Sequence, residues 1–227
     1  MRIRNFIFIS VFCINTVFVS GQQNDFFKDV RDGHVYPAVI IGKQVWMGTN
    51  LAWLPSVNRL SDSQFDTPCY YVYAFDATDT TLALKSDYFS RYGTLYNYPA
   101  AKSACPPGWH LPSDEEWRVL EEYLGMSGKE SGAREWRGSG KIGLKVKAVK
   151  GYNNVGGSNE SGLGLLPGGC RGYGGCESEG FCGYFWTSSP AGGDNAWRRG
   201  FCGDDDGSCR QEDRRYFGCS VRCLKDQ

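Results

Sequence analysis

The chain has 227 residues, of which 41% are hydrophobic, 15% aromatic and 22% charged, and its formal net charge is zero. This composition is typical of one folded domain, and the balanced charge provides no basic field for binding a phosphate backbone. Two histidines, His34 and His110, are a poor supply for an ordinary zinc site or a histidine-based enzyme. Composition therefore argues against a nucleic-acid partner and favours binding over catalysis.

Residues 1–21 begin with two arginines, continue with an apolar run from Phe6 to Val19 and end in small residues. This order predicts a secretory signal peptide, so the mature chain is expected in the periplasm, at the cell surface or in the medium. A buried helix or a membrane anchor is the alternative, but the run is short against the roughly 20 residues of a bilayer span. Cys13 raises lipidation as a further alternative, although Phe12 stands where a lipid-attachment site requires a small residue. No later segment is apolar for long enough to cross a membrane.

Disulfide bonds are the expected use of the cysteines in the mature chain. None of them forms a C-x-x-C pair, which disfavours zinc, whereas an oxidising compartment favours bridges. The odd count leaves at least one thiol free or joined to another molecule. The nine cysteines are Cys69, Cys105, Cys170, Cys176, Cys182, Cys202, Cys209, Cys219 and Cys223.

Residues 22–34 are polar and without pattern, which predicts a linker between the signal peptide and a domain over residues 35–226. The domain begins with two β-rich runs, 38–41 and 45–47, at the spacing of a hairpin. A loop of mixed character that contains Cys69 follows.

Two helices are predicted next. Three alanines between residues 98 and 105 favour a short helix that ends at Cys105. A longer amphipathic helix is predicted over 113–124, because Ser113 and Glu116 form a capping box and acids fill the first turn. Its apolar residues, Trp117, Leu120 and Leu124, fall on one face.

The last third of the chain predicts long loops and an antiparallel sheet. Fifteen of the fifty residues 151–200 are glycine, against a usual level of about 7%. Four short strands are expected, and in the last of them Ser220 and Arg222 alternate with the cysteines and face solvent. Helices first and strands later indicate an α+β fold with Gly-rich loops. The expected strands are 183–189, 195–202, 209–217 and 219–224.

Five segments keep a recognisable order across residues 35–226: VYPAVIIGKQVWMGTNL, YGTLYNYPAAKSACPPGWHLPSDEEW, SNESGLGLLPGG, GYFWTSS and SVRCLKD. Together they resemble the Fibrobacter succinogenes major paralogous domain family. The resemblance implies a C-type-lectin-like fold, related to that of the formylglycine-generating enzymes. Members of the family are mostly exported proteins or lipoproteins of Bacteroidetes and Fibrobacteres, and no biochemical activity is established for them. This chain departs from the family at Leu163, where an aromatic residue is usual, and in three additional cysteines, Cys170, Cys176 and Cys182.

The resemblance also implies a disulfide between Cys105 and Cys223, which the family pattern keeps. Closing a loop of over 100 residues would contribute roughly 4 to 5 kcal/mol. A second bridge is expected between Cys202 and Cys209, which flank the turn GDDDGS.

No residue is predicted to be catalytic. His110 precedes the capped helix and no local sequence supplies it with a nucleophile, so a structural histidine packed beneath that helix is expected. Ser188 and Ser189 lack a G-x-S-x-G elbow and are expected to be structural. An oxidase like the formylglycine-generating enzymes would need a reactive cysteine pair. Cys219 and Cys223 share a strand face, but a structural role is expected for both.

No cofactor is expected, and calcium is the one weak possibility. Asp204, Asp206 and Asp213 partly imitate a calcium loop, but Cys202 occupies the first ligand position and Asp213 replaces the bidentate glutamate. A solvated hairpin turn explains these residues better.

The region 195–216 is the candidate recognition surface, because it combines flat apolar rings with planar guanidinium donors. An ordinary wet sheet face with balanced charges is an equal alternative. The candidate ligand-binding residues are Trp197, Arg198, Arg199, Arg210, Arg214, Arg215 and Tyr216.

We therefore expect an exported, noncatalytic recognition module that binds a glycan or a protein at the bacterial surface or envelope. A structural or adhesive envelope protein is the alternative, and the oxidase is a lesser one.

Overall fold

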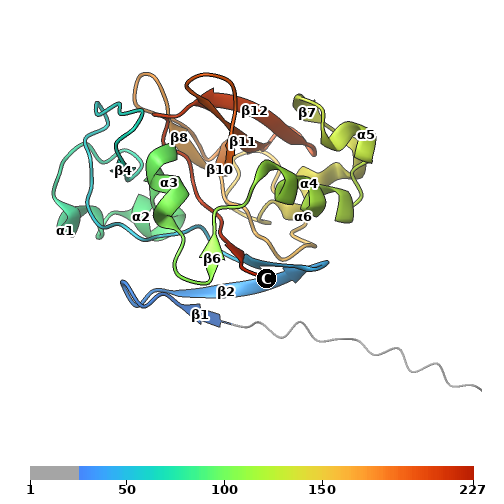
Figure 1. Cartoon of the computed structure of the whole chain (residues 1–227), viewed down its shortest axis with the longest axis horizontal. Helices are drawn as coiled ribbons and strands as arrows, with labels where there is room; N and C mark the ends of the chain where they lie inside the picture. The colour runs from blue at the N-terminus through green and yellow to red at the C-terminus, as the bar shows by residue number, and fades with distance from the viewer. Residues whose placement is uncertain (1–25) are drawn as a thin grey trace, which may run out of the picture.

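The computed structural model describes residues 26–227 (Figure 1). The predicted signal peptide and residues 22–25 lie outside this range. Within it the strands form a five-stranded sheet, a six-stranded sheet and a two-stranded ribbon, connected by short helices. Figure 1 shows the first sheet at the bottom and the second at the top, with α1 and α2 at one end and α4 to α6 at the other. The α+β prediction is confirmed.

The lower sheet has the strand order β1-β2-β3-β13-β6 and joins both ends of the described chain. The predicted hairpin is confirmed as β2 and β3, and its turn needs Gly42, whose φ is +62°. The strands are β1 (Phe26–Lys28), β2 (Val35–Ile41), β3 (Gln44–Met47), β6 (Trp109–His110) and β13 (Leu224–Lys225).

The segment predicted as a linker contributes to this sheet. β1 pairs with β2 in antiparallel orientation, and the side chain of Asp29 in the turn between them is fully buried. The Arg31 guanidinium forms a 2.6 Å ion pair with Asp29, which lets the carboxylate stay charged in the interior. Residues 26–34 therefore belong to the folded domain, which begins earlier than the predicted boundary at residue 35.

The upper sheet has the order β7-β12-β11-β10-β8-β9, with one parallel pair, β8 and β10. Three of the four predicted late strands are confirmed as its central members. Its strands are β7 (Glu135–Arg137), β8 (Gly168–Arg171), β9 (Cys176–Glu179), β10 (Cys182–Pro190), β11 (Asn195–Cys202) and β12 (Ser208–Arg214).

The fourth predicted strand, 219–224, is wrong in its extent and in its solvent face. Only β13 at its end is a strand, and the residues before it form single bridges, Cys219 to Tyr96 and Ser220 to Phe185. Because neighbouring segments cover both sides, Ser220 and Arg222 are buried as completely as Cys219 and Cys223, which flank them. The alternation of residues along this segment correctly predicted which side chains share a face. It could not show that other segments cover both faces.

Both predicted helices are confirmed. α3 (Tyr98–Ala104) ends at Cys105, and α4 (Asp114–Tyr123) begins with the capping box of Ser113 and Glu116. The remaining elements are α1 (Thr80–Ala83), α2 (Asp87–Tyr92), α5 (Gly128–Ser131), α6 (Ile142–Val146), the 3-10 turn η1 (Ser139–Lys141), and the ribbon strands β4 (Tyr70–Tyr71) and β5 (Leu95–Tyr96).

The apolar face of α4 packs on a core in which Trp117 meets Trp46 of β3 at 4.9 Å between ring centroids. Leu163, which stands where the resembled family usually has an aromatic residue, is fully buried in this same cluster. The described chain keeps the core continuous at that position with an aliphatic side chain.

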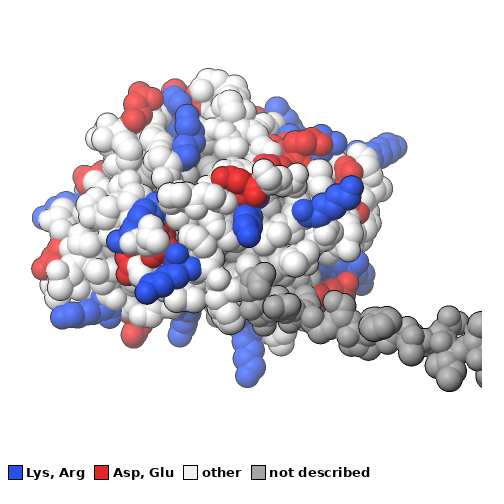
Figure 2. All heavy atoms as spheres, turned by 60° about the horizontal axis from the view of Figure 1, so that its bottom comes forward, with Lys and Arg blue, Asp and Glu red and all other residues white. Residues whose placement is uncertain are grey.

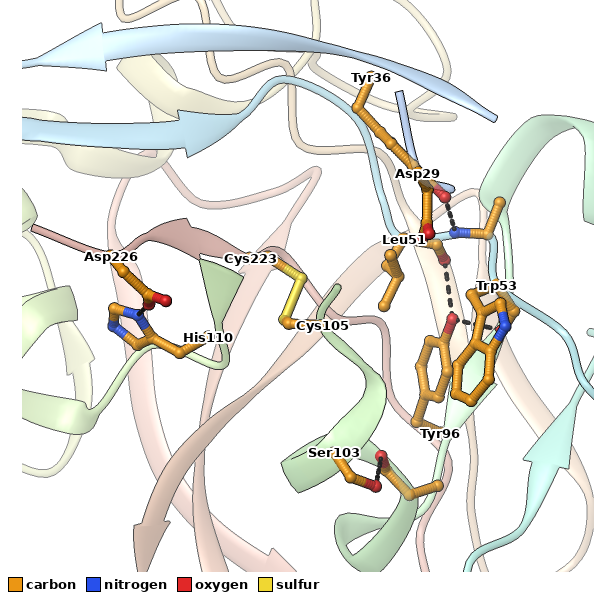
Figure 3. The surroundings of a disulfide bond; sticks show 12 residues. Asp29, Tyr36, Leu51, Trp53, Tyr96, Ser103, Cys105, His110, Cys223 and Asp226 are labelled. Carbon is orange, nitrogen blue, oxygen red and sulfur yellow. Dashed lines mark hydrogen bonds and ion pairs between the residues drawn. A yellow bond between two sulfur atoms is a disulfide. The ribbon is translucent and has the colours of Figure 1, made fainter. Parts of the chain in front are cut away.

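Two disulfides lie within the described residues. The bridge from Cys105 to Cys223 is confirmed, with the two Cα atoms 5.9 Å apart, and it ties the end of α3 to the residue before β13 (Figure 3). The predicted bridge from Cys202 to Cys209 is wrong, because Cys202 is bonded to Cys182. The register of β10 and β11 places these two directly opposite each other, whereas Cys209 lies opposite Gly200.

Candidate functional site

The predicted recognition residues do not form one surface. Alternation along β11 places Trp197 and Arg199 on one face of the upper sheet and Arg198 on the other. Arg214 is exposed at the end of β12, and Arg215 and Tyr216 follow it.

Arg199 is fully buried beneath α4, where it serves the interior. Its Nε donates to Glu121 at 2.9 Å and its Nη1 to Asp114 at 2.7 Å. Arg210 donates to the same Asp114, and Arg137 donates to Glu121 at 2.7 Å. Burial raises the pKa of Glu121, but the neighbouring guanidinium groups of Arg199 and Arg137 outweigh it and hold that pKa below its ordinary value.

Trp197 is half-buried, and guanidinium groups of the protein itself stack on it. The Arg210 Cζ lies 3.7 Å from the ring centroid and the Arg134 Cζ 5.0 Å from it. Arg134 is in turn paired with Glu212 at 2.6 Å. Trp197 is therefore stacked by guanidinium groups from β12 and from the residue before β7.

Arg198 points to the opposite face and is buried. It pairs with Asp213 at 2.6 Å, and its Cζ lies 4.0 Å from the centroid of the Tyr184 ring. Asp213 is thus at the far end of β12 from the turn that holds Asp204 and Asp206, so the three calcium candidates do not converge. No cluster of three or more potential metal-ligating His, Cys, Asp or Glu side chains occurs in the part of the chain that the structure describes.

Beyond β12, Tyr216 belongs to an aromatic surface cluster. Its ring contacts Phe65 at 5.0 Å and Tyr173 at 6.0 Å between centroids, and Tyr173 is largely exposed. Arg215 faces Asp194 and Asp66 at 3.5 and 3.6 Å. Of the predicted residues, this group retains the most access to solvent.

A groove that the sequence did not predict is lined by residues outside the region 195–216. Two clefts of about 510 and 410 Å3 share the lining residues His34, Ala52, Leu84 and Phe89 and thus adjoin. The first is further lined by Arg31, Asp32, Gly33, Trp53, Leu54 and Pro55. We call the two together the Trp53 groove.

Trp53 is held rigidly in this groove. The Arg31 Cζ lies 4.1 Å from its ring centroid, and Tyr70 meets it edge-on. Its carbonyl oxygen accepts a 2.7 Å hydrogen bond from the hydroxyl of Tyr96, which stands beside the Cys105 bridge in Figure 3. Arg31 itself is fixed by Asp29. Burial raises the pKa of Asp29, but the hydrogen bonds from Arg31 outweigh it and hold the pKa below its ordinary value, so Asp29 is charged at neutral pH.

The second cleft has a polar floor. Asn50 donates to the carbonyl oxygen of Tyr92 at 3.0 Å and accepts 2.8 Å from Arg222, a buried cation behind the wall. Ser90 and Arg91 are further polar residues in the lining of this cleft. The groove thus combines aromatic walls with hydrogen-bonding groups.

The only local signal for this groove is the run AWLP, residues 52–55, which places a tryptophan in a segment without helix or strand pattern. His34, Trp53 and Phe89 come from three distant segments, and only the folded chain brings them together.

His110 is not packed beneath the helix as expected, because its ring is partly exposed and lies between two carboxylates. The His110 ring lies 2.6 Å from Asp226 (Figure 3). It also lies 3.0 Å from Glu116 and so joins the first turn of α4 to the segment after β13. Ser189 Oγ accepts from the backbone N–H of Asp114. The Ser188 carbonyl accepts from the hydroxyl of Tyr98.

Figure 2 shows one face of the molecule, on which basic and acidic side chains are interspersed rather than gathered. Within residues 26–227, none of the helices combines the length and apolar character that a bilayer span requires.

Comparison with known proteins identifies one family. The sequence model described as the Fibrobacter succinogenes major domain matches residues 39–225. Searches of curated proteins and of solved structures give no match.

Proposed function

The chain belongs to the Fibrobacter succinogenes major domain family, and from this premise we propose that it is an exported, noncatalytic recognition module. In this proposal the domain has a C-type-lectin-like fold and binds a glycan at the bacterial surface or envelope. The Trp53 groove carries this proposal. An aromatic ring held in an open groove beside planar hydrogen-bonding side chains suits a saccharide, which presents apolar C–H faces and ring hydroxyls.

The rigidity of the groove supports recognition. Trp53 is stacked by Arg31, and Arg31 is fixed by the buried Asp29, so neither side chain needs to be immobilised when a ligand binds. Preorganisation of this kind lowers the entropic cost of binding.

The lining of the groove favours binding over glycoside cleavage. Hydrolysis normally requires two carboxyl groups that flank the scissile bond. The described lining of the groove contains one, Asp32, whose Oδ1 accepts a 2.9 Å hydrogen bond from the backbone N–H of His34 in its own turn.

Two features of the fold support export and the lectin-like architecture. The two disulfides are of the kind that persists in oxidising compartments. The strands at the beginning and end of the domain, β2, β3 and β13, lie in one sheet, which a bridge ties to α3.

The test is an array of glycans and bacterial surface polysaccharides, probed with the oxidised full chain with calcium and with chelator. We expect saturable binding that Trp53→Ala weakens by about tenfold or more, the effect of a central aromatic contact. Trp136→Ala is the matched control, because Trp136 is exposed on β7, an edge strand of the upper sheet, and does not line the groove.

Other outcomes decide against the groove. Binding that Trp197→Ala removes and Trp53→Ala does not would return the site to the region 195–216. Calcium-dependent binding would instead favour the acidic residues Asp204 and Asp206. If the protein binds none of the glycans and forms multimers in solution, the structural or adhesive envelope protein would be favoured.

The oxidase has no supporting observation. Of its two cysteines, Cys223 is bonded to Cys105, and Cys219 is fully buried.

A further inference from the structure

Two of the thiols in the described part of the chain stand opposite each other. Arg171 and Gly218 form an antiparallel bridge in which each backbone N–H donates to the other residue's carbonyl, at 2.8 and 2.9 Å. In antiparallel register the next two residues, Cys170 of β8 and Cys219, lie directly opposite each other. Their backbones are not hydrogen-bonded to each other, because hydrogen-bonded and non-hydrogen-bonded positions alternate. Such a pair has its Cα atoms about 4.5 Å apart and its side chains on the same face.

This spacing falls in the Cα range of about 4.4 to 6.8 Å that a disulfide spans. The molecule already contains a bridge of this kind, because Cys182 and Cys202 are directly opposed in β10 and β11 and are bonded. Both Cys170 and Cys219 belong to one buried cluster.

The surroundings of the two sulfur atoms are shared. The Arg198 Nη1 lies 3.6 Å from the Cys219 Sγ, and the Cys170 Sγ lies 3.5 Å from the Glu177 Oε1. Burial raises the pKa of Cys219 to about 11 and raises that of Cys170 further, while Arg198 opposes the shift at both. While the pair is reduced, burial thus keeps both thiols of the folded protein protonated, and protonated thiols do not attack a disulfide.

We propose that Cys170 and Cys219 form a third disulfide of this protein, closed during folding by exchange with an oxidised thiol-disulfide reagent or protein before the pair is buried. One thiolate attacks the reagent's disulfide, forming a mixed disulfide and releasing one reduced thiol. The second thiolate attacks the bonded protein sulfur and releases the other reduced thiol. The two cysteines lose two protons and two electrons, and the reagent's disulfide is reduced to two thiols.

The new bridge would fasten β8 of the upper sheet to the segment that leads into β13 of the lower one. Cys219 stands four residues before Cys223, which is already bonded to α3. Both ends of this buried crossing would then be covalently held.

Peptide mapping tests the proposal directly. The full chain is first reduced and denatured, and it is then refolded with oxidised and reduced glutathione. The refolded protein is denatured in the presence of a thiol-alkylating reagent, which blocks the remaining free thiols. It is then digested with trypsin without reduction. Cleavage after Lys150, Arg171, Arg215 and Arg222 isolates the two cysteines in separate peptides, 151–171 and 216–222. We expect these two peptides to be joined. Recovery of both as alkylated peptides, or of either joined to a different cysteine, would overturn the proposal.

Variants provide a second readout. Cys170→Ser should leave Cys219 alkylated, and Cys219→Ser should leave Cys170 alkylated, whereas Cys176→Ser, which changes a cysteine of the adjacent strand β9, should leave the joined peptides in place. A protein folded before the oxidant is added should not form the bridge. Rapid bridge formation in that folded protein would contradict closure during folding.

Discussion

Arg199 on β11 and Glu121 on α4 form an ion pair at 2.9 Å in which neither side chain is exposed. This pair lies between the upper sheet and its covering helix, and Arg137 of β7 completes it from the opposite side at 2.7 Å. A buried charge is tolerated only when its partners remain, so the pair makes the position of α4 on the sheet sensitive to single substitutions.

Glu121→Gln is expected to lower the free energy of unfolding by about 3 to 5 kcal/mol, because it leaves Arg137 buried without a counter-charge and Arg199 with Asp114 alone. Urea unfolding followed by tryptophan fluorescence measures this change. Glu115→Gln, at an exposed position of the same helix, should change stability by less than about 1 kcal/mol. Equal effects of the two variants would show that the network contributes nothing specific.

The same carboxylate predicts acid sensitivity. Since the folded-state pKa of Glu121 lies below its unfolded value, its contribution is present above the unfolded pKa and is lost as pH falls through the folded one. The wild-type protein should therefore lose stability below about pH 4.5, the ordinary range of Glu. In Glu121→Gln this part of the pH dependence should be reduced, as urea titrations at several pH values would show.

His110 predicts a dependence of opposite sign near neutral pH. Burial lowers its pKa, but Asp226 and Glu116 outweigh that effect, so the folded-state pKa lies above 6.5. Its contribution is present below the unfolded pKa and is lost as pH rises through the folded one. Because the ring is partly exposed, we expect about 1 kcal/mol or less. His110→Asn should remove this decline, which unfolding curves from pH 6 upward measure, and His34→Asn should keep it.

The two disulfides should contribute unequally. The bridge from Cys105 to Cys223 spans a sequence separation of 118 and that from Cys182 to Cys202 one of 20. Chain entropy then gives about 5 and about 3 kcal/mol. Paired Cys→Ser variants of each bridge, unfolded in urea, should follow this order, and a larger loss from the short loop would argue against the entropic explanation.

Lys147 predicts a local effect in the Gly-rich region. Its buried Nζ donates to the carbonyls of Cys202 and Asp205, each at 2.8 Å. Lys147→Met leaves these acceptors unpaired and should cost about 2 to 4 kcal/mol. Hydrogen exchange should accelerate in the turn 203–207, whereas Lys150→Met, at an exposed position, should leave it unchanged.

Several parts of the fold follow from local sequence alone. The capping box of Ser113 and Glu116, the hairpin around Gly42 and the late strands β10 to β12 depend on neighbours within a few residues, so their patterns predicted them correctly. The bridge from Cys105 to Cys223 was predicted because the resemblance to the family carried it.

Tertiary structure decided which charges are inside and where the groove lies. Arginines such as Arg198 and Arg199 are typical of recognition surfaces, yet both are buried in the folded chain. Arg198 pairs with Asp213, and Arg199 pairs with Glu121 of α4. Strand register places Cys202 opposite Cys182 rather than Cys209, and so decides the disulfide. Trp53 and His34 line one cleft only in the folded chain. The sequence by itself determined the local elements, because capping, turns and periodicity act over short separations. Only the tertiary structure determined burial, pairing and the groove, because each of these depends on segments that long-range packing brings together.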